Sequence, residues 1–150
     1  MEQALRESEE KHRTLFETMA QGAVYQDAEG AITAANPAAE RILGLSLAQM
    51  QGCRSVDPRW RTIREDGTEF PGSRHPAMVA LRTGQKVSDV VLGVFNPREE
   101  AYRWLSVNAV PLFHKGAEEP HQVYTTFDDI TELRAARERI REILERIRSG

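Results

Sequence analysis

Histidines and acidic residues are the side chains in this sequence with the clearest potential for chemistry. His75 stands where a helical pattern begins, directly before a proline. His114 and His121 flank a loop that contains Glu118 and Glu119, a spacing that could clip a metal ion. Side chains of these types in a polar loop are more often simply solvated. We therefore expect no metal site in this chain.

The remaining candidates do not form the pattern of an enzyme site. The single cysteine, Cys53, excludes an internal disulfide and a cysteine-only metal cage, and it suits a reducing compartment. The sequence has no glycine-rich phosphate loop, no nucleophile elbow and no cluster of His, Asp and Glu at metal-ligand spacing on one helix face. We expect a domain that is not itself catalytic, whatever kinase or cyclase activity a full-length protein carries.

Length and charge indicate one domain without a nucleic-acid role. The chain has 150 residues, 40% of them hydrophobic, which is enough for one core. Its net charge of -3 gives no basic field for nucleic acid. No apolar run approaches the roughly 20 residues that span a bilayer, and the N-terminus lacks the core of a signal peptide. We expect a soluble, cytoplasmic segment without membrane contact, and leave open whether the full-length protein is anchored.

The end of the chain passes from strand to helix without a flexible residue. In "HQVYTTFDDITELRAARERI" a β-branched and aromatic run continues into a charged helical pattern with no Gly or Pro between them. Thr131 can cap the first turn with its hydroxyl, and Asp129 and Glu132 favour the positive end of the helix dipole. Such a joint transmits rotation or tilt, whereas a Gly/Ser linker would dissipate it. A helix start with a good cap would explain the same residues without any signal.

Both ends of the chain have the spacing of helices that pair with another helix. The N-terminal positions are Leu5, Ser8, His12, Leu15 and Met19. The C-terminal positions are Ile130, Leu133, Arg137, Ile140, Leu144 and Ile147. Steps of three and four also suit an amphipathic helix lying on its own domain. Because a C-terminal helix of about 18 residues soon outruns the surface of a small domain, we expect a coiled-coil linker and a parallel homodimer.

The middle of the chain predicts a sheet interrupted by short helices. The expected strands are GAVYQD, AITAAN, KVSDVVLGVF, AYRWLSVNAVPLF and HQVYTTFDDI. Four short helices are expected after Asn36, Ser46, Asp57 and His75. The third is expected to carry Trp60 and Ile63. Strands around a block of small helices indicate an α+β domain with a mostly antiparallel, five-stranded sheet.

Five segments occur in the order found in one family: "LRESEEKHRTLFETM", "NPAAERILG", "DPRW" with "REDGTEFP" and "HPAM", "RWLSVNAVPLF" and "DDITELRAARERI". Together they resemble a PAS (Per-Arnt-Sim) sensory domain of a bacterial signal-transduction protein over nearly the whole chain. The resemblance implies a five-stranded antiparallel sheet, with small helices over a cavity on one face and flanking helices or a second subunit on the other. The implied domains are a flanking helix at 1–20, a sensor core at 21–131 and a signalling helix at 132–150.

The resemblance also implies how a signal would leave the domain. Asp129, Ile130 and Thr131 resemble the Asp-Ile-Thr exit motif of the family, where the last strand becomes the signalling helix. The path would continue through Leu133, Arg137 and Ile140 to an output domain in cis, such as a histidine kinase or a diguanylate cyclase. The alternative is a dimerisation module that binds no ligand.

Cofactors known in the family fit the sequence poorly. Flavin-binding relatives have an Asn-Cys-Arg motif, whereas this chain has Gly52 before Cys53. They also have a glutamine two residues before the exit-motif aspartate, where this chain has Phe127. Haem-binding relatives use a histidine on the helix before the third strand, and His75 starts that helix, although it also reads as a cap. Flavin is not expected, haem is a minor alternative, and the cofactor stays unknown.

Strand alternation predicts which side chains line the implied cavity. If the family's register holds, the helix-covered face carries Leu105, Val107, Ala109, Val123, Thr125 and Phe127. His75 could reach in from its helix. The opposite face would present Trp104, Ser106, Asn108 and Tyr124 to a flanking helix or to a second subunit. This lining suits a self-filled core or a small apolar ligand.

Overall fold

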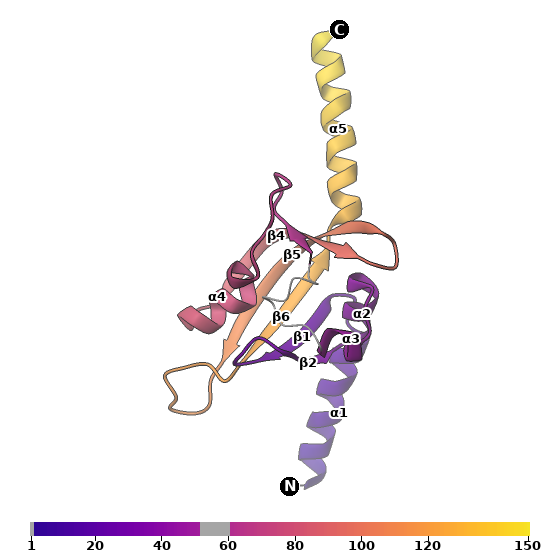
Figure 1. Cartoon of the computed structure of the whole chain (residues 1–150). Helices are drawn as coiled ribbons and strands as arrows, with labels where there is room; N and C mark the ends of the chain where they lie inside the picture. Colours follow the sequence, from indigo (N-terminus) through magenta and orange to yellow (C-terminus); the bar gives the residue numbers. More distant parts are fainter. Residues whose placement is uncertain (1, 52–60) are drawn as a thin grey trace.

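The computed structural model describes residues 2–51 and 61–150, and these residues form one antiparallel sheet with helices on both faces (Figure 1). The strand order is β2-β1-β6-β5-β4-β3. The strands are β1 (Gly22–Asp27), β2 (Ile32–Ala35), β3 (Thr62–Ile63), β4 (Val87–Asn96), β5 (Ala101–Leu112) and β6 (Gln122–Asp129). The helices are α1 (Glu2–Thr18), α2 (Pro37–Leu43), α3 (Leu47–Gln51), the 3-10 turn η1 (Gly72–Arg74), α4 (Pro76–Thr83) and α5 (Thr131–Ser149).

The α+β class is confirmed, but the sheet has six strands where the sequence predicted five. The sixth is β3, in which Ile63 pairs with Gly93 of β4, so the predicted helical placement of Ile63 is wrong. A tight turn at Gly67 sends the chain back, and Phe70 N donates to Thr62 O at 2.9 Å. Two β-branched residues before an Asp-Gly turn are a hairpin signal. The rest of that predicted helix, including Trp60, lies outside the described residues.

Capping residues begin α2 and α3 as the sequence predicted. Asn36 Oδ1 accepts from Ala39 N at 2.9 Å, which caps α2, and it also accepts from Ala23 N at 2.9 Å, which ties the helix start to β1. Ser46 and Gln49 form a reciprocal capping box at α3, with bonds of 2.8 and 3.2 Å. The caps therefore hold α2 and α3 in place against the sheet.

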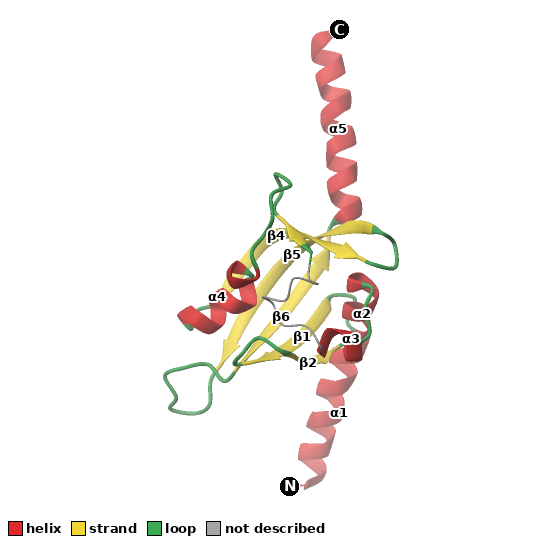
Figure 2. Cartoon of the chain, viewed as in Figure 1, coloured by secondary structure: helices red, strands yellow, loops and turns green. Residues whose placement is uncertain are grey.

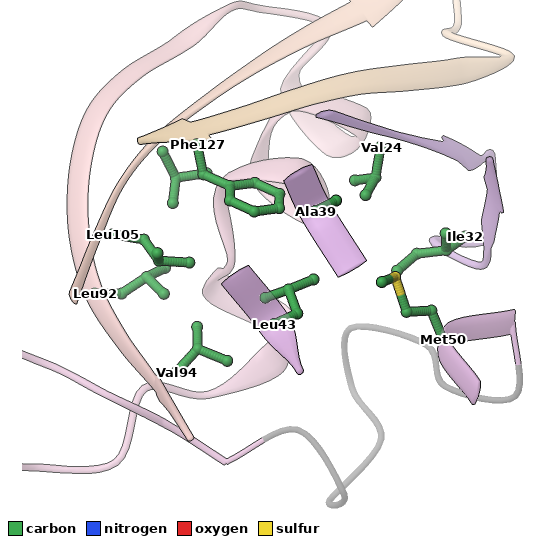
Figure 3. Packing of buried hydrophobic residues seen from close by; sticks show 10 residues of the cluster. Val24, Ile32, Ala39, Leu43, Met50, Leu92, Val94, Leu105 and Phe127 are labelled. Atoms are coloured by element: carbon green, nitrogen blue, oxygen red, sulfur yellow. The ribbon is translucent and has the colours of Figure 1, made fainter. Parts of the chain in front are cut away.

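Helices α2, α3 and α4 cover one face of the sheet (Figure 2). In Figure 3, Ala39 and Leu43 of α2 point toward strand residues, and Met50 of α3 lies beside Ile32. The buried cluster consists of Val24, Ile32, Ala39, Leu43, Met50, Leu92, Val94, Leu105, Val107 and Phe127. A second, smaller cluster is formed by Ala77, Ala80, Ala109 and Val123. The core thus lies between the sheet and the small helices.

Helix α1 packs against the other face, and α5 leaves the sheet in the opposite direction (Figure 1). The Tyr25 ring lies 5.8 Å from that of Phe16 and 4.8 Å from that of Tyr124. The Tyr124 hydroxyl donates to Met19 Sδ at 3.9 Å. The C-terminal end of α1 is therefore held by aromatic contacts. Among the described residues, none of the helices is long and apolar enough to cross a membrane.

Candidate functional site

A cavity of about 100 Å³ lies between the sheet and the small helices. Its lining is Gln26, Ile32, Leu43, Thr62, His75, Pro76, Ala77, Leu92, Val94, Leu105, Val107, Thr125 and Phe127. All six strands contribute to this lining, and α2 and α4 add Leu43, Pro76 and Ala77. The wall is mainly hydrocarbon, with four polar side chains set into it.

Most of the side chains that strand alternation assigned to a cavity lie on it. The structure brings together Leu105, Val107, Thr125, Phe127 and His75. Ala109 and Val123 share their sheet face but pack instead against Ala77 and Ala80 of α4, where both strand residues are fully buried. The alanines let the helix approach the sheet closely and leave no space at that end.

His75 is turned into the interior by a hydrogen bond to Thr62. Its Nε2 lies 2.9 Å from Thr62 Oγ1, and the same hydroxyl donates to Phe70 O at 2.8 Å. Burial lowers the pKa of His75 to about 4, partly opposed by a backbone hydrogen bond to Phe70. The imidazole is therefore neutral at pH 7. As predicted, His75 is the N-cap residue of α4 and is followed by Pro76, but its side chain makes no cap bond.

A second polar pair lies on the strands. Thr125 Oγ1 donates to Gln26 Oε1 at 3.2 Å, and Gln26 Nε2 donates to Gly30 O at 3.0 Å. Sequence reasoning missed Gln26 and Thr62. Gln26 could have been found, because it stands two residues after the buried Val24 and alternation places both on one face. Thr62 was hidden by the wrong helix prediction.

The cavity does not fit the larger cofactors of the family. Pockets for drug-sized ligands are typically about 300–1,000 Å³, so a cavity of about 100 Å³ has no room for a haem or a flavin in this conformation. His75 Nε2, the nitrogen that an axial ligand could use, is already bonded to Thr62. Cys53 and Gly52, which bear on the flavin comparison, lie outside the described residues.

The two histidines of the β5–β6 loop lie close together. His114 and His121 stack with their ring centroids 3.6 Å apart. Within residues 2–51 and 61–150, no group of three or more His, Cys, Asp or Glu side chains is placed to hold a metal ion. The two rings therefore act as a stacked pair at the hairpin end.

The joint between β6 and α5 is built on the Asp129 carboxylate. Its Oδ2 accepts from Arg103 Nη1 at 2.6 Å. Its Oδ1 accepts from the Thr131 amide at 3.0 Å and from the Thr131 hydroxyl at 2.6 Å. The hydroxyl oxygen accepts in turn from Trp104 N at 2.9 Å, and Ile130 N donates to Trp104 O at 2.8 Å. The joint is thus fastened to β5 at several atoms.

This geometry corrects the role expected of Thr131. The N-cap position of α5 is Ile130, and no side chain caps the helix there. Instead, the Thr131 hydroxyl donates a hydrogen bond to Asp129 and accepts one from Trp104 N on the neighbouring strand. Thr131 therefore ties the first turn of the helix to the sheet.

Arg103 links the joint to the β4–β5 turn. Its guanidinium pairs with Glu99 as well as Asp129, with Nε donating to Glu99 Oε2 at 2.9 Å. The hydrogen bond to Glu99 and then that to Asp129 raise the pKa of Arg103, and the Arg103 hydrogen bond lowers the pKa of Glu99. The arginine stays charged at every physiological pH.

The first turns of α5 touch the sheet, and the rest of the helix does not. The Arg134 guanidinium lies 4.2 Å from the centre of the Trp104 ring and 3.0 Å from Glu65 Oε2. Beyond it, Leu133, Ile140, Leu144 and Ile147 are 49–69% exposed. Arg137 and Ile143 are also exposed. The predicted seam is therefore an apolar stripe on a projecting helix.

Comparison with known proteins places this architecture in one class. Residues 10–74 match the family model described as "PAS domain". The PAS domain of a protein from Colwellia psychrerythraea is 17% identical with a TM-score of 0.62, covering 82% of this chain and 97% of that one. A domain of a sensory box sensor histidine kinase/response regulator from Geobacter sulfurreducens is 20% identical with a TM-score of 0.60, covering 83% and 96%. No curated protein matches the chain.

The fold is thus that of sensory domains of signalling proteins, with flanking helices at both ends. Residues 10–74 match the PAS domain family, and the chain shares its fold with solved PAS domains. It resembles the PAS domains of sensor histidine kinases.

Proposed function

We propose that this chain is a non-catalytic sensory domain that detects a small molecule in its cavity and passes a conformational change through Asp129, Ile130 and Thr131 to α5. An output domain such as a histidine kinase or a diguanylate cyclase would follow in cis. The path along the helix runs through Leu133, Arg137 and Ile140. Occupancy of the cavity and the position of α5 are then two coupled states of one domain.

One observation carries this proposal: the cavity wall and the joint share the same two paired strands. Phe127 lines the cavity, and Asp129 follows it by two residues on the same face of β6. On β5, Leu105 lines the cavity and Arg103 precedes it by two residues. Two residues of strand span about 7 Å. A shift of the wall at Phe127 or Leu105 therefore moves the ion pair that positions α5.

The exposed stripe on α5 supports a parallel homodimer as the unit that signals. Its positions recur at steps of three and four, which is the seam of a coiled coil. The flanking e positions of this repeat are Arg134, Arg141 and Arg148. An antiparallel pair of these helices would set the arginines against each other, whereas a parallel pair keeps them apart. The outer sheet face next to α1 would add to the contact.

The test is the response of the full-length protein to its stimulus when Asp129 is replaced by Asn. We expect output to change or to lose its dependence on the stimulus, while the domain stays folded by circular dichroism. Asp128→Asn is the matched control, because the exposed Asp128 lies outside this network and its carboxylate accepts a hydrogen bond from Gln21 Nε2. Unaltered output and an unaltered stimulus response for Asp129→Asn would leave a dimerisation module as the better description.

A further inference from the structure

Three of the four polar side chains described in the cavity wall, Thr62, His75 and Thr125, present hydrogen-bond acceptors. A threonine hydroxyl has one proton, and Thr62 donates its proton to Phe70 O while Thr125 donates its proton to Gln26 Oε1. Because Thr62 already donates, His75 Nε2 must be the donor in the 2.9 Å bond between them. A neutral imidazole protonated at Nε2 has an unprotonated Nδ1. The two hydroxyl oxygens and this nitrogen therefore have lone pairs to offer.

The described part of the cavity lining offers no charge to an ionised ligand. None of its described lining residues is Asp, Glu, Lys or Arg. His75 is uncharged at pH 7, because burial lowers its pKa to about 4. A carboxylate or ammonium group would lose its hydration without gaining a counter-charge, which is strongly unfavourable.

The volume restricts the ligand further. An engineered apolar cavity of about 150 Å³ accepts benzene, and the cavity here is about 100 Å³. A molecule the size of one six-membered ring is therefore close to the upper limit. The hydrocarbon wall of Leu92, Leu105 and Val107 suits the apolar part of such a molecule.

We propose that the cavity selects a small uncharged molecule, about one ring in size, that carries an O–H or N–H group and donates it to the acceptors at His75, Thr62 or Thr125. Phenol is the simplest molecule with these properties. The inference rests on the proposed function, and it specifies the chemical class of what is sensed.

Four compounds test separately whether the ligand must be uncharged, must be no larger than one ring and must donate a hydrogen bond. Phenol, benzene, benzoate and 2-naphthol are each titrated into the ¹⁵N-labelled chain at pH 7, with amide shifts of the cavity residues as the readout. We expect saturable binding of phenol and benzene, with phenol about five- to tenfold tighter because it adds one hydrogen bond. Benzoate and 2-naphthol should not bind. The proposal is overturned by benzoate or 2-naphthol binding as tightly as phenol, by equal affinities for phenol and benzene, or by no binding of either.

Variants locate the binding in the cavity. Val107→Phe should abolish binding of both phenol and benzene by filling the space. Thr62→Val and His75→Phe remove acceptors at similar volume and should reduce the preference for phenol over benzene at least twofold. His114→Phe is the matched control, because His114 lies in an exposed loop and should leave both affinities unchanged. Phenol affinity that survives Val107→Phe in a folded protein would place the binding elsewhere and refute the proposal.

Failure of this inference and failure of the proposed function have different signatures. If phenol binds as expected and Asp129→Asn leaves output unaltered, the ligand class stands and the signalling role does not. If Asp129→Asn alters the stimulus response but the cavity rejects phenol and benzene, the signalling role stands and the ligand class is wrong.

Discussion

At the scale of single residues, Asp129 has more partners than a capping residue needs. Its carboxylate accepts from Arg103 and twice from Thr131. A cap alone contributes about 1 kcal/mol to stability, whereas hydrogen bonds to charged groups contribute about 1.5–3 kcal/mol. We expect Asp129→Ala to lower the free energy of unfolding by about 2 kcal/mol, measured by urea denaturation.

Asp129→Asn separates the charge from the geometry, because the amide keeps an oxygen for Thr131. We expect Asp129→Asn to lower the free energy of unfolding by about half as much as Asp129→Ala does. In a double-mutant cycle, Arg103→Met combined with Asp129→Asn should cost less than the sum of the two single changes. Strict additivity would mean that the 2.6 Å pair contributes nothing.

His75 makes stability depend on pH. Its pKa is about 4 in the folded chain against 6.5 for an unperturbed histidine. Between these values the unfolded chain binds a proton that the folded chain does not, so the free energy of unfolding falls as pH drops from about 6.5 to about 4. The full loss is about 3 kcal/mol. Chemical denaturation across this range should show it, and His75→Phe should show a shallower slope. Parallel slopes for the two proteins would contradict the burial of His75.

The residues of the site were only partly predictable from sequence. Alternation grouped Leu105, Val107 and Phe127 without tertiary information, and the register of the resembled family assigned that group to the helix-covered face. It could not find that α4 fills the space beside Ala109, because that depends on how closely the helix approaches. The contacts of Thr131 and Asp129 with β5 were not predicted, because their partners, Trp104 and Arg103, are more than 20 residues away in the sequence.

At the scale of elements, the β6–α5 joint is rigid and the helix beyond it is unsupported. Asp129 and Thr131 hold the joint, and Arg134 is the last residue of α5 for which a contact to the sheet or its loops is described. Inserting one residue after Ala135 rotates everything downstream by about 100°, whereas seven residues nearly restore the phase.

Output of the full-length protein should therefore change sharply for insertions of one to three residues and recover near seven. The melting temperature of the sensory domain should stay the same throughout, because the insertions lie beyond its contacts. A steady decline of output with insertion length, without recovery at seven, would show that α5 is only a tether.

Most of the described elements followed from local signals, whereas β3 and the 3-10 turn η1 were not predicted. Asn-Pro and Ser-x-x-Gln gave the starts of α2 and α3, since caps act within four residues. The short strand β3 was missed because two residues carry little periodic signal. Only its pairing with β4 and the return of the chain at Gly67 define it.

At the scale of the whole molecule, the projecting stripe on α5 should make the chain dimerise. Analytical ultracentrifugation at tens of micromolar should show a monomer–dimer equilibrium. Leu144→Glu should weaken the dimer at least tenfold by placing a charge in the seam, whereas Arg137→Leu should strengthen it. Ala135→Glu, on the opposite side of α5, is the control and should have little effect. A strictly monomeric chain, or equal effects of Leu144→Glu and Ala135→Glu, would contradict the α5 interface.

The central claim is that occupancy of the cavity changes the joint, and xenon tests it without assuming any polar recognition, because xenon enters apolar cavities. The ¹⁵N-labelled chain is placed under xenon pressure, and shifts of the Leu105 and Val107 amides report occupancy. The account predicts that the amides of Trp104, Ile130 and Thr131 shift in parallel, and that Asp129→Asn reduces the shifts transmitted into α5. Shifts at Leu105 and Val107 that stop before Ile130 and Thr131 would contradict it.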